Sequence, residues 1–381
     1  MGNWLVTLLL PLAAWSGWWV AMRKEVRDLR KSKSREAYFE GLSFLLNDQT
    51  GQAIDVFLSM AEIDQQTFDN QLTLGTLFRK RGELDRALHL HQQLLDYPNA
   101  TPLQRQSVAY ELAEDCIQAG MYEQAKHLLE SLRDEHFRLK DVLNTLYRLY
   151  ERTADWQGAI KARELWQNSG FGDCRQQIAH YYCEIAQRAL AQNETQAAHA
   201  AVVSALQIDA RCGRAYLMRA QLAEQQGEYV SAIHSYQSIA EQALDFLPEI
   251  LPFLMKAYQH IDREDEYLAW LEQKEAEQPF VRLTLALVHI LEKRAPDAAL
   301  QLLEKRLQTS ANPLLLADYL RLHQSDDIRA LYQTLGNVLT PKTVYQCNQC
   351  GFRQQRVIWH CPACHAWSSF RPVLELKLEQ R

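Results

Sequence analysis

Residues 82–96 read GELDRALHLHQQLLD, and this stretch decides the fold. Its apolar residues recur every three or four positions and so lie on one stripe of a helix. Gly82 stands five positions before the small residue Ala87 and can end the preceding helix with a positive φ. That helix, over 71–78, carries its own leucines. We therefore predict a helical hairpin in which Ala87 marks the closest approach of the two helices.

The pairing of a turn residue with a small residue five positions later recurs along the chain. The clear pairs are Asp48/Ala53, Gly82/Ala87, Gly120/Ala125, Ala154/Ala159, Asn193/Ala198 and Gly227/Ala232, and weaker ones are Asp262/Tyr267, Arg294/Ala299 and Ser325/Ala330. Most alanines are 34 residues apart, which is the tetratricopeptide period. Two longer steps, of 38 and 39 residues, predict longer loops near 98–102 and 169–173. We predict an all-α, tetratricopeptide-type superhelical solenoid over residues 36–340.

Function follows from this architecture, because each hairpin buries its apolar face only against its neighbours. The stack then presents a concave surface that is suited to binding proteins or peptides. A stack that serves only as a spacer is the alternative. Aromatic residues could line the groove, but at helical spacing they are more often core. The candidates are Trp166, Tyr181 and Tyr182.

The N-terminal segment 1–22 contains no Lys, Arg, Asp or Glu. As a helix it would be about 33 Å long, enough to cross a hydrocarbon core of about 30 Å. Residues 23–35 follow with seven basic and two acidic side chains, a net charge of +5. The alternative interpretation of 1–22 is a cleaved signal peptide. In a signal peptide the basic residues precede the apolar stretch, whereas here they follow it. We predict a transmembrane helix over 1–22 whose N-terminus faces outward, a basic juxtamembrane linker over 23–35, and a cytoplasmic remainder.

Four cysteines near the C-terminus have the spacing C-x2-C-x10-C-x2-C: Cys347, Cys350, Cys361 and Cys364. Two such turns can place four thiolates around one tetrahedral ion, zinc or iron. Four sulfurs leave no open coordination position, which excludes metal-assisted hydrolysis. His360 and His365 flank the cysteines and are expected not to bind the metal. We predict a small metal domain over 341–381, folded largely by its ion.

The same segment contains three aromatic residues that we expect to pack against the last repeats: Trp359, Trp367 and Phe370. The other cysteines are scattered without the spacing of a disulfide framework. We expect buried thiols in a reducing compartment at these positions, Cys116, Cys174, Cys183 and Cys212.

Charge and motifs exclude several functions. The chain has a net charge of −6, while residues 23–35 carry +5 and residues 341–381 carry +4, which leaves −15 for the part between them. Such an acidic array is a poor nucleic-acid surface. A nucleic-acid-binding ribbon remains an alternative for the mildly basic C-terminal segment alone. No P-loop, nucleophile elbow or HExxH motif occurs, so we do not expect an enzyme.

Several stretches resemble the lipopolysaccharide assembly protein B family of Gram-negative bacteria. They are GLSFLLN at 41–47, LTLGTLFR at 72–79, IAHYYCE at 178–184, CGF at 350–352, WHCP at 359–362 and AWS at 366–368. The resemblance extends over the whole chain and includes the order of anchor, basic flank, repeats and four cysteines. The N-terminal segment departs from it, since its four tryptophans match the family only in character.

The resemblance implies an inner-membrane adaptor that controls lipopolysaccharide synthesis. Such an adaptor brings the deacetylase that commits lipid A synthesis to the membrane protease FtsH, and it responds to a membrane protein that senses lipopolysaccharide. The family's metal domain is rubredoxin-like and is docked on the repeats. Two other functions remain open, a membrane-anchored assembly scaffold without a proteolytic role and an electron-transfer protein. The sequence also leaves open homo-oligomer formation and the choice between zinc and iron.

Overall fold

The computed structural model describes residues 67–242, 246–310, 312–323 and 342–375, together with Trp15, Trp18, Met22, Ser43 and Phe44. The predicted anchor 1–22, apart from three of these residues, and the basic linker 23–35 lie outside this set. So do the repeat pairs Asp48/Ala53 and Ser325/Ala330. Within the described part of the chain, no helix is both long and apolar enough to span a membrane.

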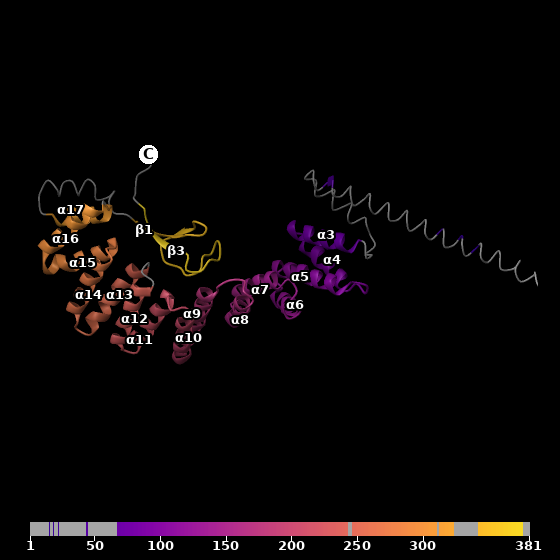
Figure 1. Cartoon of the computed structure of the whole chain (residues 1–381), viewed down its shortest axis with the longest axis horizontal. Coiled ribbons are helices and arrows are strands. Elements are labelled where there is room, and N and C mark those ends of the chain that lie inside the picture. Colours follow the sequence, from indigo (N-terminus) through magenta and orange to yellow (C-terminus); the bar gives the residue numbers. More distant parts are fainter. Residues whose placement is uncertain are drawn as a thin grey trace, which may run out of the picture. The chain divides into compact units, whose positions relative to one another are not determined.

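The described residues up to 323 form α-helices joined by short turns, and they divide into two compact units at Thr153 and Ala154. The first unit contains α3 (Phe68–Lys80), α4 (Leu84–Leu95), α5 (Pro102–Gln118), α6 (Tyr122–Asp134) and α7 (Leu139–Thr153). The helices of the second are α8 (Trp156–Asn168), α9 (Arg175–Ala191), α10 (Thr195–Ile208), α11 (Gly213–Gln225), α12 (Tyr229–Gln242), α13 (Leu247–His260), α14 (Glu264–Glu277), α15 (Val281–Arg294), α16 (Pro296–Thr309) and α17 (Pro313–Leu322). Successive helices pair as antiparallel hairpins, such as α3 with α4 and α9 with α10 (Figure 1).

The repeat pairs define the hairpins as the sequence predicted. Six turn residues have φ between 54° and 80°: Gly82, Gly120, Ala154, Asn193, Gly227 and Asp262. At Gly82 the next N–H, that of Glu83, donates back to the Phe78 carbonyl at 2.9 Å and closes the end of α3. The residues five positions after these six are all buried: Ala87, Ala125, Ala159, Ala198, Ala232 and Tyr267. Ala299, five positions after Arg294, is buried as well. The prediction of tetratricopeptide-like hairpins is therefore confirmed for these repeats.

Apolar side chains between successive hairpins form the cores of both units. Tyr181 is fully buried, which confirms that it belongs to the core, and Trp166 packs edge-on against Phe171 in the loop after α8. The four scattered cysteines are also buried and unpaired by disulfides, as predicted: Cys116, Cys174, Cys183 and Cys212.

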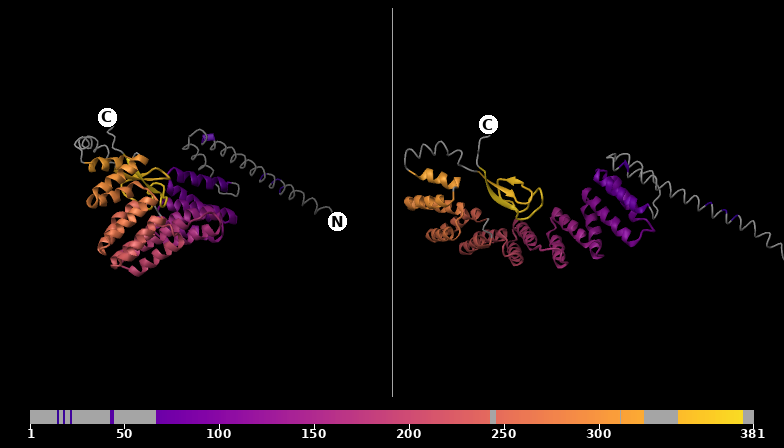
Figure 2. Two further views of the ribbon diagram at one scale, coloured as in Figure 1. Left: turned by 60° about the vertical axis from the view of Figure 1, so that its left-hand side comes forward. Right: turned by 45° about the horizontal axis from the view of Figure 1, so that its top comes forward.

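The C-terminal part of the second unit is a small antiparallel sheet with strand order β2-β1-β3. Its strands are β1 (Lys342–Cys347), β2 (Arg353–Gln354) and β3 (Phe370–Glu375). β1 pairs with β3 from Lys342↔Glu375 to Cys347↔Phe370, and with β2 at Tyr345↔Gln354. β2 is thus an edge strand. Figure 2 shows this sheet, in yellow, beside the helices of the second unit.

A buried polar chain joins three helices of the first unit. The Nδ1 atom of His91 on α4 lies 2.5 Å from Oδ2 of Asp115 on α5, and both side chains are inaccessible to solvent. Arg79 on α3 donates to the other oxygen of Asp115 at 2.8 Å. The Nε2 atom of His91 faces the Leu72 carbonyl at 3.2 Å. Both ring nitrogens therefore have partners, and the imidazole ring is fixed in one position.

Gly75 of α3 leaves room for this ring, and Gly75→Ala tests the constraint. An added Cβ would lie 2.2 Å from His91 Nε2. Alanine usually stabilises a helix interior by about 1 kcal/mol relative to glycine. Here we expect destabilisation by about 1–3 kcal/mol, because the ring cannot move without breaking its bond to Asp115. Urea unfolding followed by circular dichroism measures the change.

The double variant Gly75→Ala/His91→Ala is the control, since it removes the ring that the new methyl group meets. Its destabilisation should be clearly smaller than the sum of the two single effects. Strict additivity would show that close approach to His91 does not explain the glycine.

Candidate metal centre

The four predicted cysteines come together at one end of the sheet. Cys347 ends β1, and the chain turns back after it, with the Gly351 N–H donating to the Cys347 carbonyl at 2.9 Å. The second turn repeats this bond, from the His365 N–H to the Cys361 carbonyl at 2.9 Å. Each turn ends in a residue with positive φ, 79° at Gly351 and 57° at His365. Two equivalent loops thus point their sulfurs at a common centre.

The spacing of the sulfurs fits a tetrahedral metal site. All four Sγ atoms lie within 4.8 Å of one another. Cys347 and Cys364 are 3.7 Å apart, and Cys350 and Cys361 are 3.6 Å apart. A metal–sulfur bond of about 2.3 Å in tetrahedral geometry separates neighbouring sulfurs by about 3.8 Å. Two sulfur pairs already have this separation, and the set of four is compact enough to surround one zinc or iron ion.

The surroundings of Cys347 favour its thiolate form. Burial opposes ionisation of this thiol, but its hydrogen bonds with the Ser369 hydroxyl and with backbone N–H groups outweigh this effect and lower its pKa to about 6. The Ser369 hydroxyl lies 3.2 Å from the Cys347 sulfur. Such bonds are what a metal-bound thiolate needs around it.

The opposite shift at Cys364 shows why a cation is needed. The Ala366 N–H lowers the pKa of the Cys364 thiol, but desolvation and the three neighbouring sulfurs outweigh it and raise that pKa to about 12. Four negative sulfurs cannot coexist at these distances unless a cation neutralises them. The site is therefore built for an ion that binds as the thiols lose their protons.

The two loops are unequally exposed. Cys347 and Cys361 are buried, whereas Cys350 and Cys364 are exposed. His360 and His365 do not belong to the group of candidate ligand atoms around the centre, which consists of the four sulfurs. His360 Nε2 instead lies 3.1 Å from the His365 carbonyl oxygen. The metal site is thus a four-sulfur site with one solvent-facing side and no coordination position left for a substrate.

The metal loops dock on the helices through Trp367. Its indole ring lies between two imidazole rings, stacked on His180 of α9 at 5.1 Å and on His360 at 4.4 Å. Trp156 and Tyr181 meet the same ring edge-on, at 6.4 and 5.7 Å. Next to it, the Ser368 hydroxyl lies 2.5 Å from His180 Nε2. His180 and Ser368 are 188 residues apart in the sequence, and their contact fixes the metal loops to α9. The ring contact of Trp367 with Trp156 joins the same loops to α8.

The expectation that three aromatic residues pack on the last repeats is wrong for Trp367 and Phe370. Trp367 contacts α8 and α9, and Trp359 lies against Phe246, just before α13, at 4.7 Å. Phe370 instead packs inside the small domain against Phe352. The reason is that residues 324–341 separate α17 from β1, so adjacency in sequence does not force adjacency in space.

Sequence reasoning missed His180 and Ser368 as the polar contact of this interface. A histidine on the apolar face of a helix has the pattern of an ordinary core residue. The one available signal was the resemblance, because IAHYYCE at 178–184 and AWS at 366–368 are the two stretches that meet here.

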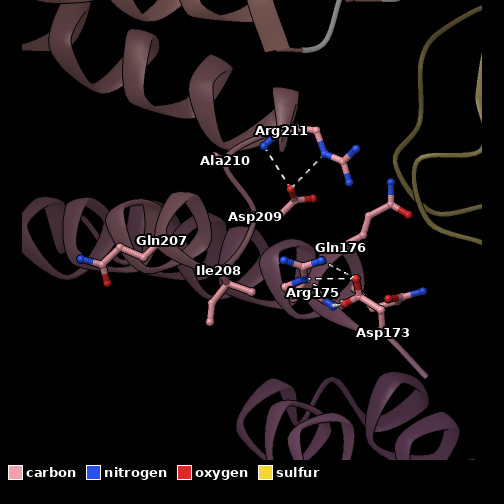
Figure 3. Close-up of a pocket in the computed structure, with 9 residues that line it drawn as sticks. Asp173, Arg175, Gln176, Gln207, Ile208, Asp209, Ala210 and Arg211 are labelled. Carbon is pink, nitrogen blue, oxygen red and sulfur yellow. Dashed lines mark hydrogen bonds and ion pairs between the residues drawn. The ribbon is translucent and has the colours of Figure 1, made fainter. Parts of the chain in front are cut away.

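A second candidate site is a polar groove of about 700 Å³ where α9 and α11 begin (Figure 3). Asp173 pairs with Arg175 at 2.7 Å, and Asp209 with Arg211 at 3.8 Å. The hydrogen bond from Arg175 lowers the pKa of Asp173 to about 2. Because each arginine already faces a carboxylate, the groove has no unbalanced charge for a ligand, and we interpret it as solvated surface.

Comparison with known proteins agrees with this geometry. The protein-family model described as a rubredoxin metal binding domain matches residues 345–372. Over 97% of its length the chain is 33% identical to lipopolysaccharide assembly protein B of Escherichia coli strain K12, of which it covers 98%. The chain belongs to this family. The Haemophilus influenzae member is 31% identical over 97% of the chain and 98% of its own length.

Solved structures with similar helices include a tetratricopeptide repeat protein from Parabacteroides merdae. It is 16% identical, covers 70% of this chain and 98% of its own, and has a TM-score of 0.31. The C-terminal part of a repeat protein from Cytophaga hutchinsonii has the same identity and coverage, with a TM-score of 0.35.

Replacing Cys347 tests the metal site. Cys347→Ser should lose the ion and unfold the 342–375 domain, because metal binding supplies about 10–16 kcal/mol in comparable small domains. The repeat helices have their own core and should keep their helical signal. Elemental analysis of the purified chain measures metal per chain and distinguishes zinc from iron. Cys116→Ser, far from the site in sequence and buried in the first unit, is the matched control. A Cys347→Ser chain that retains one ion would refute this ligand set.

Acidification tests the role of His180. Burial lowers its pKa to about 3, with Arg214 and His360 adding to the effect. An undocked His180 would titrate near 6.5. Below about pH 6.5 the undocked form therefore takes up a proton that the docked form excludes, and docking should weaken up to tenfold per pH unit between about 6.5 and 3.

Hydrogen exchange in residues 342–375 between pH 7.5 and 5.5, with metal content followed in parallel, measures this docking. In His180→Gln the pH dependence should be flatter, since glutamine does not titrate. An identical pH profile in this variant would assign the effect to other groups.

Proposed function

We propose that this chain is a non-enzymatic adaptor that regulates lipopolysaccharide synthesis at the bacterial inner membrane. In this proposal it presents the deacetylase of the lipid A pathway to the protease FtsH for degradation and responds to a lipopolysaccharide-sensing membrane protein. The observation that carries it is family membership across 97% of the chain, in a family named for lipopolysaccharide assembly.

The architecture supports a binding role. Stacked helical hairpins provide extended surface, and the four-sulfur site has no free position for catalysis. The predicted anchor at 1–22 would hold this surface beside a membrane protease. Tethering turns a bimolecular encounter into a local one, and effective concentrations in the millimolar range follow for short linkers.

The test is the lifetime of the deacetylase after protein synthesis is blocked. Deleting the gene should make the enzyme long-lived, and the full chain should restore its decay. The chain 23–381, without the anchor, should fail to restore it, as should Cys347→Ser. An unchanged lifetime in the deletion strain would contradict the proteolytic role and favour the scaffold alternative. Normal decay with 23–381 would contradict the role of the anchor alone.

A further inference from the structure

A groove of about 530 Å³ lies between the repeat helices and the metal domain. On the helical side it is lined mainly by apolar residues of α11 and α13, including Leu217, Ile250 and Phe253. On the other side lie Tyr345 of β1 and the segment 355–359. Both parts of the second unit are needed to form it. The groove contains none of the four metal-site cysteines, and it adjoins the His180 contact, because Trp359 also meets the His180 ring at 6.0 Å.

The groove exposes apolar surface at Phe253. This ring is 41% accessible, although one face packs on the buried Tyr236, with ring centroids 6.3 Å apart. Val357 and Trp359 face the groove from the metal domain and are only partly buried. The remaining volume is that of a few apolar side chains and lies in the range of ligand pockets, about 300–1,000 Å³.

One positive charge at the groove has no counterpart. Arg282 pairs with Glu249 at 3.2 Å, so these two lining residues balance each other. Arg356 is exposed and makes no ion pair with any residue of the described chain. The lining therefore has a net charge of +1, which is complementary to an occupant that carries a carboxylate.

Part of the backbone of the same segment has no partner in the described chain, although the Arg356 carbonyl accepts from Gln354 Nε2 at 2.5 Å and the Trp359 carbonyl accepts from the Ser368 N–H at 2.8 Å. β2 is the edge strand of the sheet and ends at Gln354. After it, the backbone groups of Gln355, Val357 and Ile358 make no hydrogen bond within the part of the chain that the structure describes. An edge with free N–H and C=O groups can accept an added strand. A polypeptide can satisfy these groups, whereas an acyl chain cannot.

We propose that this groove binds an extended segment of the client protein, in which apolar residues adjoin an aspartate or glutamate. The segment pairs with the free backbone groups of Gln355, Val357 and Ile358. Its apolar side chains contact Phe253 and Trp359, and its carboxylate pairs with the Arg356 side chain. This inference rests on the adaptor function proposed above and assigns the client contact to one surface.

The test measures binding of purified deacetylase to the full-length chain in nanodiscs, with Arg356→Glu and Phe253→Asp. Each variant should weaken binding at least tenfold while metal content and helical signal stay unchanged. The controls are Lys305→Glu on α16, an equal charge reversal, and Val230→Asp on α12, at a side chain that is 52% exposed. Both controls should bind within twofold of the unsubstituted chain.

Peptides that tile the deacetylase identify the segment. The peptides that bind should contain an acidic residue beside apolar ones, and methylation of their backbone nitrogens should abolish binding if a strand is added. A peptide with lysine in place of the acidic residue should bind the Arg356→Glu variant more tightly than it binds the unsubstituted chain.

The outcomes separate this inference from the proposed function. If the deacetylase binds both variants normally and its turnover in cells still requires the chain, the groove assignment is wrong and the adaptor function stands. If deacetylase lifetime does not depend on the chain at all, the adaptor function itself fails. If no peptide binds but vesicles of anionic phospholipid bind in an Arg356-dependent manner, the groove holds lipid and the proposal is overturned.

Discussion

The stacking of Trp367 on His180 and His360 is the contact on which the docking of the metal domain depends. It joins the metal loops to α9, and everything formed jointly by the two parts requires it. The neutral state of His180 is part of this contact, because a charged imidazole in the same buried position would lose its hydration without gaining a counter-ion. Burial on both faces of an indole ring explains how a domain of three short strands is held against a helical surface.

The docked domain also changes how the repeats depend on one another. In a solenoid each hairpin contacts only its neighbours, so any interface can open alone. Here Trp367 meets Trp156 on α8 while Trp359 meets Phe246 beside α13. The metal domain thus bridges helices that are far apart in the array, and opening an interface between them must also break one of these contacts. Because we expect the ion to fold the bridging domain, we also expect metal loading and the rigidity of α9–α12 to be linked.

The sequence was sufficient for features that depend on local spacing. The positive φ of residues such as Gly82 and the burial of Ala87 follow from one hairpin pattern that is repeated along the chain. The four cysteines lie in two equivalent turns, and this spacing is sufficient to predict that their sulfurs meet at a single centre. Features that depend on distant contacts were not predictable in this way. The positions of Trp359 and Trp367 depend on contacts with helices that are far away in the sequence, which no periodicity encodes.

Two histidines have similar local sequence patterns but different structural roles. His91 and His180 occupy similar places on apolar helix faces, and both are almost inaccessible. His91 has a partner at each ring nitrogen within its own unit, and Gly75 is small because that ring is fixed. His180 has a hydroxyl partner at Nε2, contributed by Ser368 of the metal domain, and Nδ1 has no partner in the described chain. Burial alone therefore does not distinguish a core histidine from an interface histidine; the origin of its partners does. In this chain His91 stabilises the first unit, whereas His180 holds the metal domain against the repeat helices. The groove that these two parts form therefore depends on the His180 contact.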